Sequence, residues 1–319
     1  MPKKDKNSIE RRILDTLIKA VESSGLLPWQ RPWVVAHPIN LVTYNAHKSE
    51  GTPEEVCIKY GYKGINPLLL SLSEFSSPFW FTYKQATDLG WQIRKGEKSS
   101  FIVYWNIFEK TVTDDDGDDR IVKIPFLRYY NLFNVEQADP AEGKEPAPIP
   151  TITDIDKTDR KRDDIKELLT APWLAPTTFK GTQAAYIPSQ DRIVMPPVDA
   201  FKSYAHFYST WAHEAVHSTG HIDRLGREGI VNPSLFGSEK YGFEELIACV
   251  GQAMFCARVG VQNEDMNKND AAYLKNWLQV LKDDPRMIVR AGSQAQRAVD
   301  FIFEGYVKTY GEEDKENDD

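Results

Sequence analysis

The sequence predicts an α+β protein of two domains, with strands concentrated in the first half and helices in the second. The first half contains a stretch of β-branched and aromatic residues that folds back through an acidic loop, over 100–135. The second half contains strongly periodic helices after residue 203. Between them, a stretch rich in Pro, Ala and Glu has the composition of a linker. We therefore expect a first domain over 1–137, a linker over 138–151, a second domain over 152–310 and a disordered acidic tail over 311–319.

The predicted elements follow from periodicity and from the residues that begin and end helices. Ser8 is the expected N-cap of the first helix, and Gly90 is expected to end the third. In the first half we predict helices over 8–24, 66–73 and 82–89, and hairpin strands over 100–109 and 121–135. In the second half we predict a hairpin over 184–197 with its turn at Ser189 and Gln190, and helices over 158–170, 204–218, 243–259, 271–282 and 294–308.

The composition is that of an ordinary globular protein. The 319 residues are 41% hydrophobic and 27% charged, so a sizeable core can form. The charged N-terminus is followed by no apolar stretch, and no run reaches the about 20 apolar residues that span a bilayer. Cys57, Cys249 and Cys256 are too few for a disulfide framework and fit a reducing compartment. We expect a cytoplasmic protein without a membrane partner.

The net charge of −8 is distributed unevenly along the chain. Residues 1–135 hold 18 Lys and Arg against 16 Asp and Glu, whereas the remainder holds 21 against 31. Five acidic residues of the first half lie in the loop 114–119, so the rest of that half is clearly basic. This asymmetry suggests a first half that faces nucleic acid and a separate acidic half.

A possible metal site lies in the helix predicted over 204–218. His213 and His217 are four residues apart, so both imidazoles lie on one helix face and can reach one zinc ion at about 2.0–2.1 Å. Glu214 stands beside the first ligand and is available to accept a proton from a zinc-activated water. The alternative is a surface helix with incidental histidines. We expect one zinc per chain, or another divalent transition metal.

The third ligand has two candidates. His221 lies four residues beyond His217, but Gly220 is expected to end the helix before it. Glu245 stands near the start of the next apolar helix and is followed by Ala248, a spacing common in glutamate-type zincins, so it is the preferred ligand. Glu244 is expected to orient one histidine, although both glutamates could simply be exposed in a first turn.

Two neighbouring features are less specific. The strand DRIVMPP (191–197) could line a cleft and accept an extended peptide at its edge, or it could be a plain core strand. Tyr241 could stabilise an oxyanion near the metal, although such a tyrosine is more often a packing residue.

Aromatic and basic side chains alternate in the first half, a composition that suits single-stranded DNA. Bases stack on aromatic rings while Lys and Arg follow the phosphates. Taken alone the signal is weak, because tryptophans and tyrosines are more often core residues. The candidate DNA-binding residues are Trp33, Lys59, Tyr62, Lys63, Lys84, Arg94, Lys95 and Lys98.

The chain resembles the ArdC family of antirestriction proteins of mobile elements. The motifs that carry the resemblance are PWQRPW (28–33), the asparagine of PIN (38–40), YKGINPLLL (62–70), WFTYKQATDLGWQIRKGEKSS (80–100), YYNLFNVEQ (129–137), DRIVMPP, AHEAVHSTGHIDRLGR (212–227) and YGFEELIACVGQ (241–252). The chain departs from the family in its acidic loop and at Cys249, where related sequences often carry Glu or Asp. The resemblance implies an N-terminal domain that binds single-stranded DNA and a C-terminal zincin-like metallopeptidase domain.

The resemblance also implies a cellular role, protection of incoming mobile DNA from restriction. A restriction-enzyme subunit or another protein is then a possible partner or substrate. The competing hypothesis is a non-catalytic DNA-binding protein whose metal site only stabilises the fold. The intact Glu214 favours an enzyme, because a structural site needs no base and usually has four protein ligands.

Overall fold

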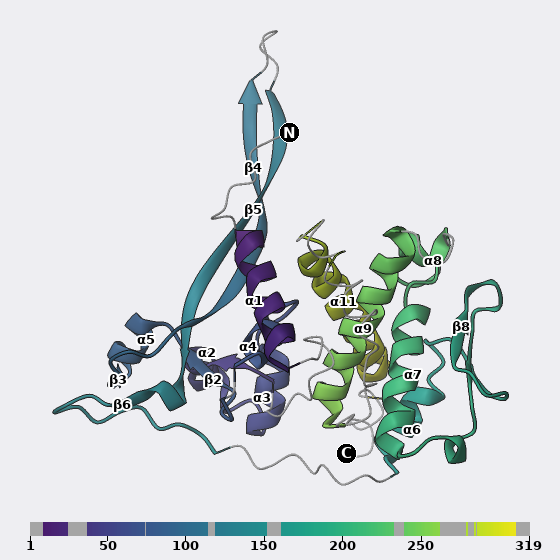
Figure 1. Ribbon diagram of the computed structural model, residues 1–319, viewed down its shortest axis with the longest axis horizontal. Coiled ribbons are helices and arrows are strands. Elements are labelled where there is room, and N and C mark those ends of the chain that lie inside the picture. Colours follow the sequence, from purple (N-terminus) through teal and green to yellow (C-terminus); the bar gives the residue numbers. More distant parts are fainter. Residues whose placement is uncertain are drawn as a thin grey trace, which may run out of the picture.

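The computed structural model describes residues 9–24, 37–73, 75–113, 119–151, 161–232, 239–261, 279, 284 and 286–310. The α+β class is confirmed: strands and short helices form the first domain, and long helices dominate the second (Figure 1). Several predictions fall outside the described residues, namely the Ser8 cap, Trp33, the acidic loop tip at 114–118, almost all of the helix at 271–282 and the tail at 311–319.

The first domain is built on a sheet of four strands in the order β1-β2-β5-β4. A two-stranded sheet of β3 and β6 lies beside it. The strands are β1 (Ile39–Asn40), β2 (Phe79–Phe81), β3 (Trp91–Ile93), β4 (Ser100–Thr113), β5 (Asp119–Asn134) and β6 (Ala138–Pro140). The helices are α1 (Ile9–Ser24), α2 (Leu41–His47), α3 (Pro53–Tyr60), α4 (Asn66–Ser71) and α5 (Tyr83–Asp88).

The predicted long hairpin is confirmed, and it is the most prominent feature of the first domain. β4 and β5 pair from Ser100 and Leu132 out to Thr113 and Asp119, and Figure 1 shows them projecting beyond α1. β4 is an edge strand, and exposed edges pair readily with other chains. Asn66 of α4 covers this edge: its Nδ2 donates to the Val103 carbonyl at 2.9 Å, and its Oδ1 accepts from the Val103 N–H at 2.8 Å.

The segment that composition identifies as a linker packs on the first domain. Its first residues form β6, which pairs antiparallel with β3. Further along, the Ala147 N–H donates to the Leu89 carbonyl at 2.8 Å, and the Trp91 indole N–H donates to the Ala147 carbonyl at 3.0 Å. Residues 138–147 are therefore ordered by backbone contacts with β3 and the end of α5.

The second domain places a small sheet against a group of helices. Its helices are α6 (Asp163–Leu169), α7 (Tyr204–Ser218), α8 (Glu228–Val231), α9 (Glu239–Val259) and α11 (Met287–Tyr310), and its strands are β7 (Thr177–Phe179), β8 (Ala185–Ile187) and β9 (Arg192–Met195). Short 3₁₀ turns lie at Pro188–Gln190 and Val198–Ala200 of this domain, and a further one, at Val135–Gln137, follows β5 in the first domain. α7 has the predicted bounds, whereas α9 and α11 begin earlier than predicted. None of the helices within the described ranges has the length and apolar composition to cross a membrane.

The strand order β7-β9-β8 decides whether DRIVMPP is an edge strand open to a peptide or a core strand. β9 pairs parallel with β7 and antiparallel with β8, and its Ile193 and Met195 are fully buried. The expectation that a peptide adds to the edge of this strand is therefore wrong, because both edges are already paired. The core-strand alternative holds, and β8 lies at the outside of the described sheet, on the side of the metal helix α7.

One hydrophobic cluster joins the two domains. It includes Leu14 and Leu17 of α1, Ile65 before α4 and Ala291 of α11. α11 approaches closely here: a Cβ on Gly292 would lie 3.0 Å from the backbone nitrogen of Ile65. The two halves are therefore packed against each other, and are not joined by the linker alone.

Candidate metal centre

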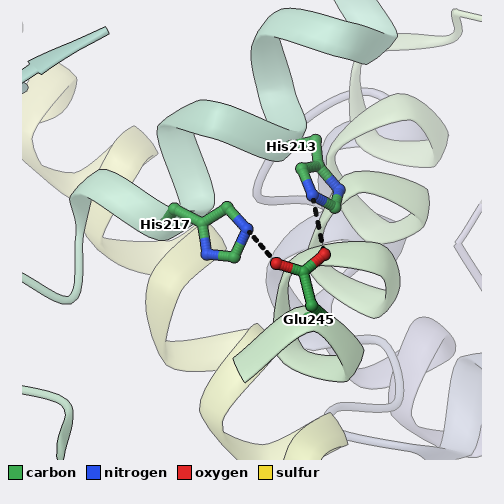
Figure 2. A group of neighbouring side chains, drawn as sticks. All are labelled: His213, His217 and Glu245. Atoms are coloured by element: carbon green, nitrogen blue, oxygen red, sulfur yellow. Dashed lines mark ion pairs between the residues drawn. The ribbon is translucent and has the colours of Figure 1, made fainter. Parts of the chain in front are cut away.

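Helix α7 presents both histidines on one face. Its N-terminus is fixed by Ser203, whose side chain accepts from the His206 N–H at 3.0 Å. The rings of His213 and His217 lie one turn apart, with centroids separated by 4.8 Å. α9 packs along α7 and places Glu245 between the two imidazoles, with its carboxylate pointing at both (Figure 2).

The three side chains have the spacing of ligands around one ion. His213 Nε2 lies 3.6 Å from Glu245 Oε2, and His217 Nε2 lies 3.4 Å from Glu245 Oε1. Two ligands held about 2.1 Å from a tetrahedral ion lie about 3.4 Å apart, so these separations leave room for a metal between the donors. Two imidazoles and one carboxylate are a typical donor set for a divalent transition metal. Within the described part of the chain, this is the one cluster of metal-ligating side chains.

His221, the rival third ligand, does not join this group. It follows the end of α7, where its Nδ1 accepts from the Asp223 N–H at 3.3 Å. The turn that begins at Gly220 carries it away from the histidine face, as the sequence suggests. Tyr241 lies in the first turns of α9, but its side chain falls outside the described residues.

The three candidate ligands interact electrostatically in the absence of a metal. Burial lowers the pKa of both histidines, but hydrogen bonds that His213 donates to Cys249 and Glu245 raise its pKa well above the usual value, and hydrogen bonds to Glu244 and Glu245 raise the pKa of His217. Burial raises the pKa of Glu245, yet the two imidazoles hold it below its usual range. A metal ion would therefore compete with protons for these imidazole nitrogens, so the affinity of the site for metal is expected to fall as the pH is lowered.

Glu214 is anchored to the sheet. Its Oε2 accepts a hydrogen bond from the backbone N–H of Tyr186 in β8 at 2.7 Å. No hydrogen bond to the other carboxylate oxygen is found among the described residues, so this oxygen can face a water or substrate. The candidate base is thus held in place by the outer strand of the sheet beside the metal helix.

A second network fixes the β8–β9 turn near Glu214. The Tyr186 hydroxyl donates to Asp191 Oδ1 at 2.9 Å, and Arg224 forms an ion pair with the same carboxylate. Arg224 also donates through Nε to the Ser218 carbonyl at the end of α7, at 2.8 Å. Asp191 has a left-handed backbone, with φ of 42°, which a short polar side chain tolerates. β8 is therefore connected to α7 by the Glu214–Tyr186 hydrogen bond and, through Asp191, by Arg224, which contacts the end of α7.

Glu244 orients His217, as the sequence suggests. Its Oε1 lies 3.3 Å from His217 Nδ1, and the side chain of Glu244 is buried. Because a carboxylate can only accept, the Nδ1 keeps its proton, and the Nε2 is the nitrogen that can give up a proton and offer its lone pair to a metal. Such partners of ligating histidines fix the ring orientation and the tautomer.

Arg227, which sequence reasoning missed, fixes Glu244 in turn. Its Nη2 donates to Glu244 Oε1 at 2.7 Å and its Nε donates to Oε2 at 3.1 Å. The same guanidinium donates to the Val216 carbonyl at 2.6 Å and to Thr219 Oγ1 at 2.7 Å, at the end of α7. Arg227 could have been predicted from the sequence, because a buried carboxylate needs a cationic partner and the HIDRLGR segment supplies two arginines near the metal helix.

Replacing Arg227 by Met should weaken metal binding by about 10–100-fold, the usual effect of losing a partner of a ligating histidine. Without the guanidinium, Glu244 is no longer held against His217. The metal dissociation constant, measured by competition with a chromophoric chelator, reports the change. Arg224→Met is the matched control, since Arg224 lies on the same loop and contacts Asp191 instead of Glu244. Equal affinities in wild type and Arg227→Met would refute this role.

The candidate DNA-binding residues occupy several environments. Lys84, Lys95 and Lys98 are exposed, and Tyr62 is half-buried with its hydroxyl 3.4 Å from Asn40 Nδ2. Lys59 pairs with Glu50 at 3.0 Å, Lys63 Nζ donates to the Ile58 carbonyl at 3.3 Å, and Arg94 pairs with Glu97 at 2.9 Å and with Asp139 at 3.3 Å. These three cations already have partners that phosphates would have to replace.

Comparison with known proteins matches both halves of the chain. Residues 7–133 match the N-terminal domain of the anti-restriction factor ArdC, and residues 165–294 match a zincin-like metallopeptidase family. Two crystal structures of a plasmid-encoded antirestriction ArdC protein superpose with a TM-score of 0.69. The metal-free structure is 34% identical and matches 94% of this chain and 98% of its own, and the Mn(II)-bound structure is 33% identical and matches 95% and 99%.

Curated relatives include much longer proteins. Two DNA primases TraC of Escherichia coli are 31% and 30% identical over 93% and 91% of this chain, which spans 27% and 19% of their lengths. An uncharacterized protein of Sinorhizobium fredii, y4eC, is 29% identical and matches 92% of this chain and 91% of its own. The domain matches, the shared architecture and the cluster of His213, His217 and Glu245 point to the same family. The chain belongs to the ArdC family of antirestriction proteins, with a zincin-like metallopeptidase domain that provides a site for a divalent metal ion.

Proposed function

We propose that this protein binds single-stranded DNA through its first domain, carries a zinc-dependent metallopeptidase-type site in its second, and protects incoming DNA of a mobile element from host restriction in the cytoplasm. The observation that supports the enzymatic half is a cluster of three candidate ligands among the described residues, with Glu214 held beside it. A structural zinc site usually has four protein ligands, whereas a catalytic site leaves one position open.

In this proposal, His213, His217 and Glu245 hold the ion and Glu214 handles the proton. A bound zinc ion supplies Lewis acidity and makes a water acidic near neutral pH. Glu214 would accept a proton from a water at that site through the oxygen that does not bond the Tyr186 N–H. As the water oxygen bonds to the peptide carbonyl carbon and the C–N bond breaks, Glu214 would return the proton to the leaving amine nitrogen. A restriction-enzyme subunit or another host protein is the candidate substrate. The competing proposal is a non-catalytic DNA-binding protein with a structural metal.

The DNA-binding half rests on the match of residues 7–133 to the ArdC N-terminal domain and on the basic, aromatic composition of this region. The TraC relatives, which carry the same region, are DNA primases. Covering the entering strand requires only this domain, so protection is expected even without hydrolysis of a protein.

Full-length protein should bind a labelled single-stranded oligonucleotide more tightly than a duplex of the same length, and the affinity should fall as salt rises. Fluorescence anisotropy measures both. Glu214→Gln should bind DNA as well as wild type does, because its side chain lies in the other domain. Absence of single-strand binding by wild type would refute the proposed function, and loss of it in Glu214→Gln would refute the division of labour between the domains.

A further inference from the structure

One face of the β4–β5 hairpin carries exposed tyrosines, an arginine and no described carboxylate. We define the tyrosine face as Ile102 and Tyr104 of β4 with Arg128 and Tyr130 of β5. The register pairs Ile102 with Tyr130 and Tyr104 with Arg128, so all four side chains project to the same side of the sheet. We propose that bases of single-stranded DNA stack on this face, an inference that rests on the proposed DNA-binding function.

The two faces of the hairpin differ in what covers them. On the tyrosine face, Tyr104 is 47% exposed and Tyr130 is 45% exposed. On the opposite face, Phe101 and Val103 are buried in the core that includes α1. A base can therefore reach the rings of the tyrosine face without displacing a helix.

Tyr129 shows why the opposite face is the poorer platform, although it is 44% exposed. The Arg12 guanidinium of α1 lies 4.5 Å from the ring centroid of Tyr129 and 4.5 Å from that of Phe101. Arg12 is held there by a hydrogen bond to Asn131 Oδ1 at 3.1 Å. The Tyr129 ring thus already stacks with a cation. No ring or cation contact of Tyr130 is found among the residues that the structure describes.

A cation beside the rings favours DNA as the occupant of the tyrosine face. Arg128 belongs to this face, whereas the acidic residues of the hairpin, Glu109 and those within 114–119, come nearer its turn in the sequence than Tyr104 does. Arg128 is exposed directly opposite Tyr104, so a phosphate can add to the contacts that this cation already makes while the attached base lies on the neighbouring ring. Stacking is available to every base of a single strand but is blocked in a duplex.

The tyrosine face lies next to Tyr62, which the sequence analysis identifies as a candidate DNA-binding residue. Ile102 and Tyr62 pack against the same cluster of Leu70, Trp80 and Leu132. Tyr104 and Tyr130 are diagonal neighbours across the two strands, about 7–8 Å apart by the usual geometry of a sheet. The platform therefore extends from Tyr62 at its base to Tyr104 along the hairpin, and successive bases can use successive rings.

Binding of a fluorescein-labelled oligothymidylate to full-length protein tests this assignment. Tyr130→Ala and Tyr104→Ala should each weaken binding by about 5–150-fold, the cost of losing one stacked base. Tyr130→Phe should bind nearly as wild type does, because the ring and not the hydroxyl provides the stacking. Arg128→Gln should reduce the slope of log affinity against log salt by about 0.7, the loss of one phosphate contact on a single strand.

Tyr129→Ala is the matched control, since this tyrosine is equally exposed on the opposite face, and it should leave DNA affinity within about twofold. Thermal unfolding of each variant shows that the hairpin remains folded. If wild type binds and Tyr130→Ala binds equally well, the tyrosine face is not the platform although the proposed function stands. Equal losses in Tyr129→Ala and Tyr130→Ala also overturn the assignment. If wild type itself does not bind, the proposed function fails and this inference fails with it.

Discussion

His213→Ala should reduce bound zinc from one ion per chain to almost none. The ion loses one of the three ligands proposed among the described residues, and the remaining pair, His217 and Glu245, binds it too weakly to retain it during gel filtration. Elemental analysis after gel filtration measures the occupancy. Because zinc competes with protons for the imidazoles of the centre, zinc uptake by wild type should also release protons, which a pH-indicator dye detects.

His221→Ala is the matched control for this prediction, because His221 was the rival ligand and lies outside the cluster. Its zinc content should equal that of wild type. Glu245→Gln should lose most of the metal, since the carboxylate is the ligand that lies between both imidazoles (Figure 2). Full occupancy in His213→Ala, or metal loss in His221→Ala, would contradict the ligand assignment.

Glu214→Gln should keep its zinc and lose about 10²–10⁴-fold of any peptide hydrolysis, the usual contribution of a general base. The amide preserves the shape of the side chain and can still accept from the Tyr186 N–H, but it cannot accept a proton at neutral pH. Hydrolysis of fluorescent casein and elemental analysis of the same samples measure the two quantities. Equal hydrolysis by wild type and Glu214→Gln would remove Glu214 from the mechanism.

In a cellular assay, the same variants distinguish protection by peptide hydrolysis from protection by binding of the entering DNA strand. Transfer of unmodified plasmid DNA into a restricting host is measured with wild type, Glu214→Gln and His213→Ala. We expect both variants to protect, because covering the strand requires only the first domain. If both lose protection while still binding DNA, hydrolysis of a protein target is the mechanism. If only His213→Ala loses it, the metal serves the fold.

The sequence predicted the elements whose signals are local. α7 was placed at its observed bounds because Ser203 caps a strongly periodic segment. The β4–β5 hairpin was found because β-branched and aromatic residues flank an acidic turn. α3 was missed even though Thr52 and Glu55 form a capping box with Pro53 in the first turn, a signal that can be read from the sequence.

Other features depend on contacts between distant residues, which no local pattern shows. β1 has two residues and β2 has three, and both are strands only because β2 pairs with β5 more than fifty residues away. The role of Arg227 depends on Glu244, 17 residues later in the chain. The core shared by α1 and α11 likewise results from tertiary packing. Composition predicts two domains joined by a linker, but it does not show that the two domains also share a hydrophobic core.

One metal ion is expected between His213, His217 and Glu245, and a crystal grown with zinc and measured with anomalous scattering at the zinc absorption edge would locate it. We expect one anomalous peak within about 2.0–2.2 Å of the Nε2 atoms of both histidines and of a Glu245 carboxylate oxygen. A peak at His221 or Cys249, or no peak between the three side chains at full zinc loading, would contradict it.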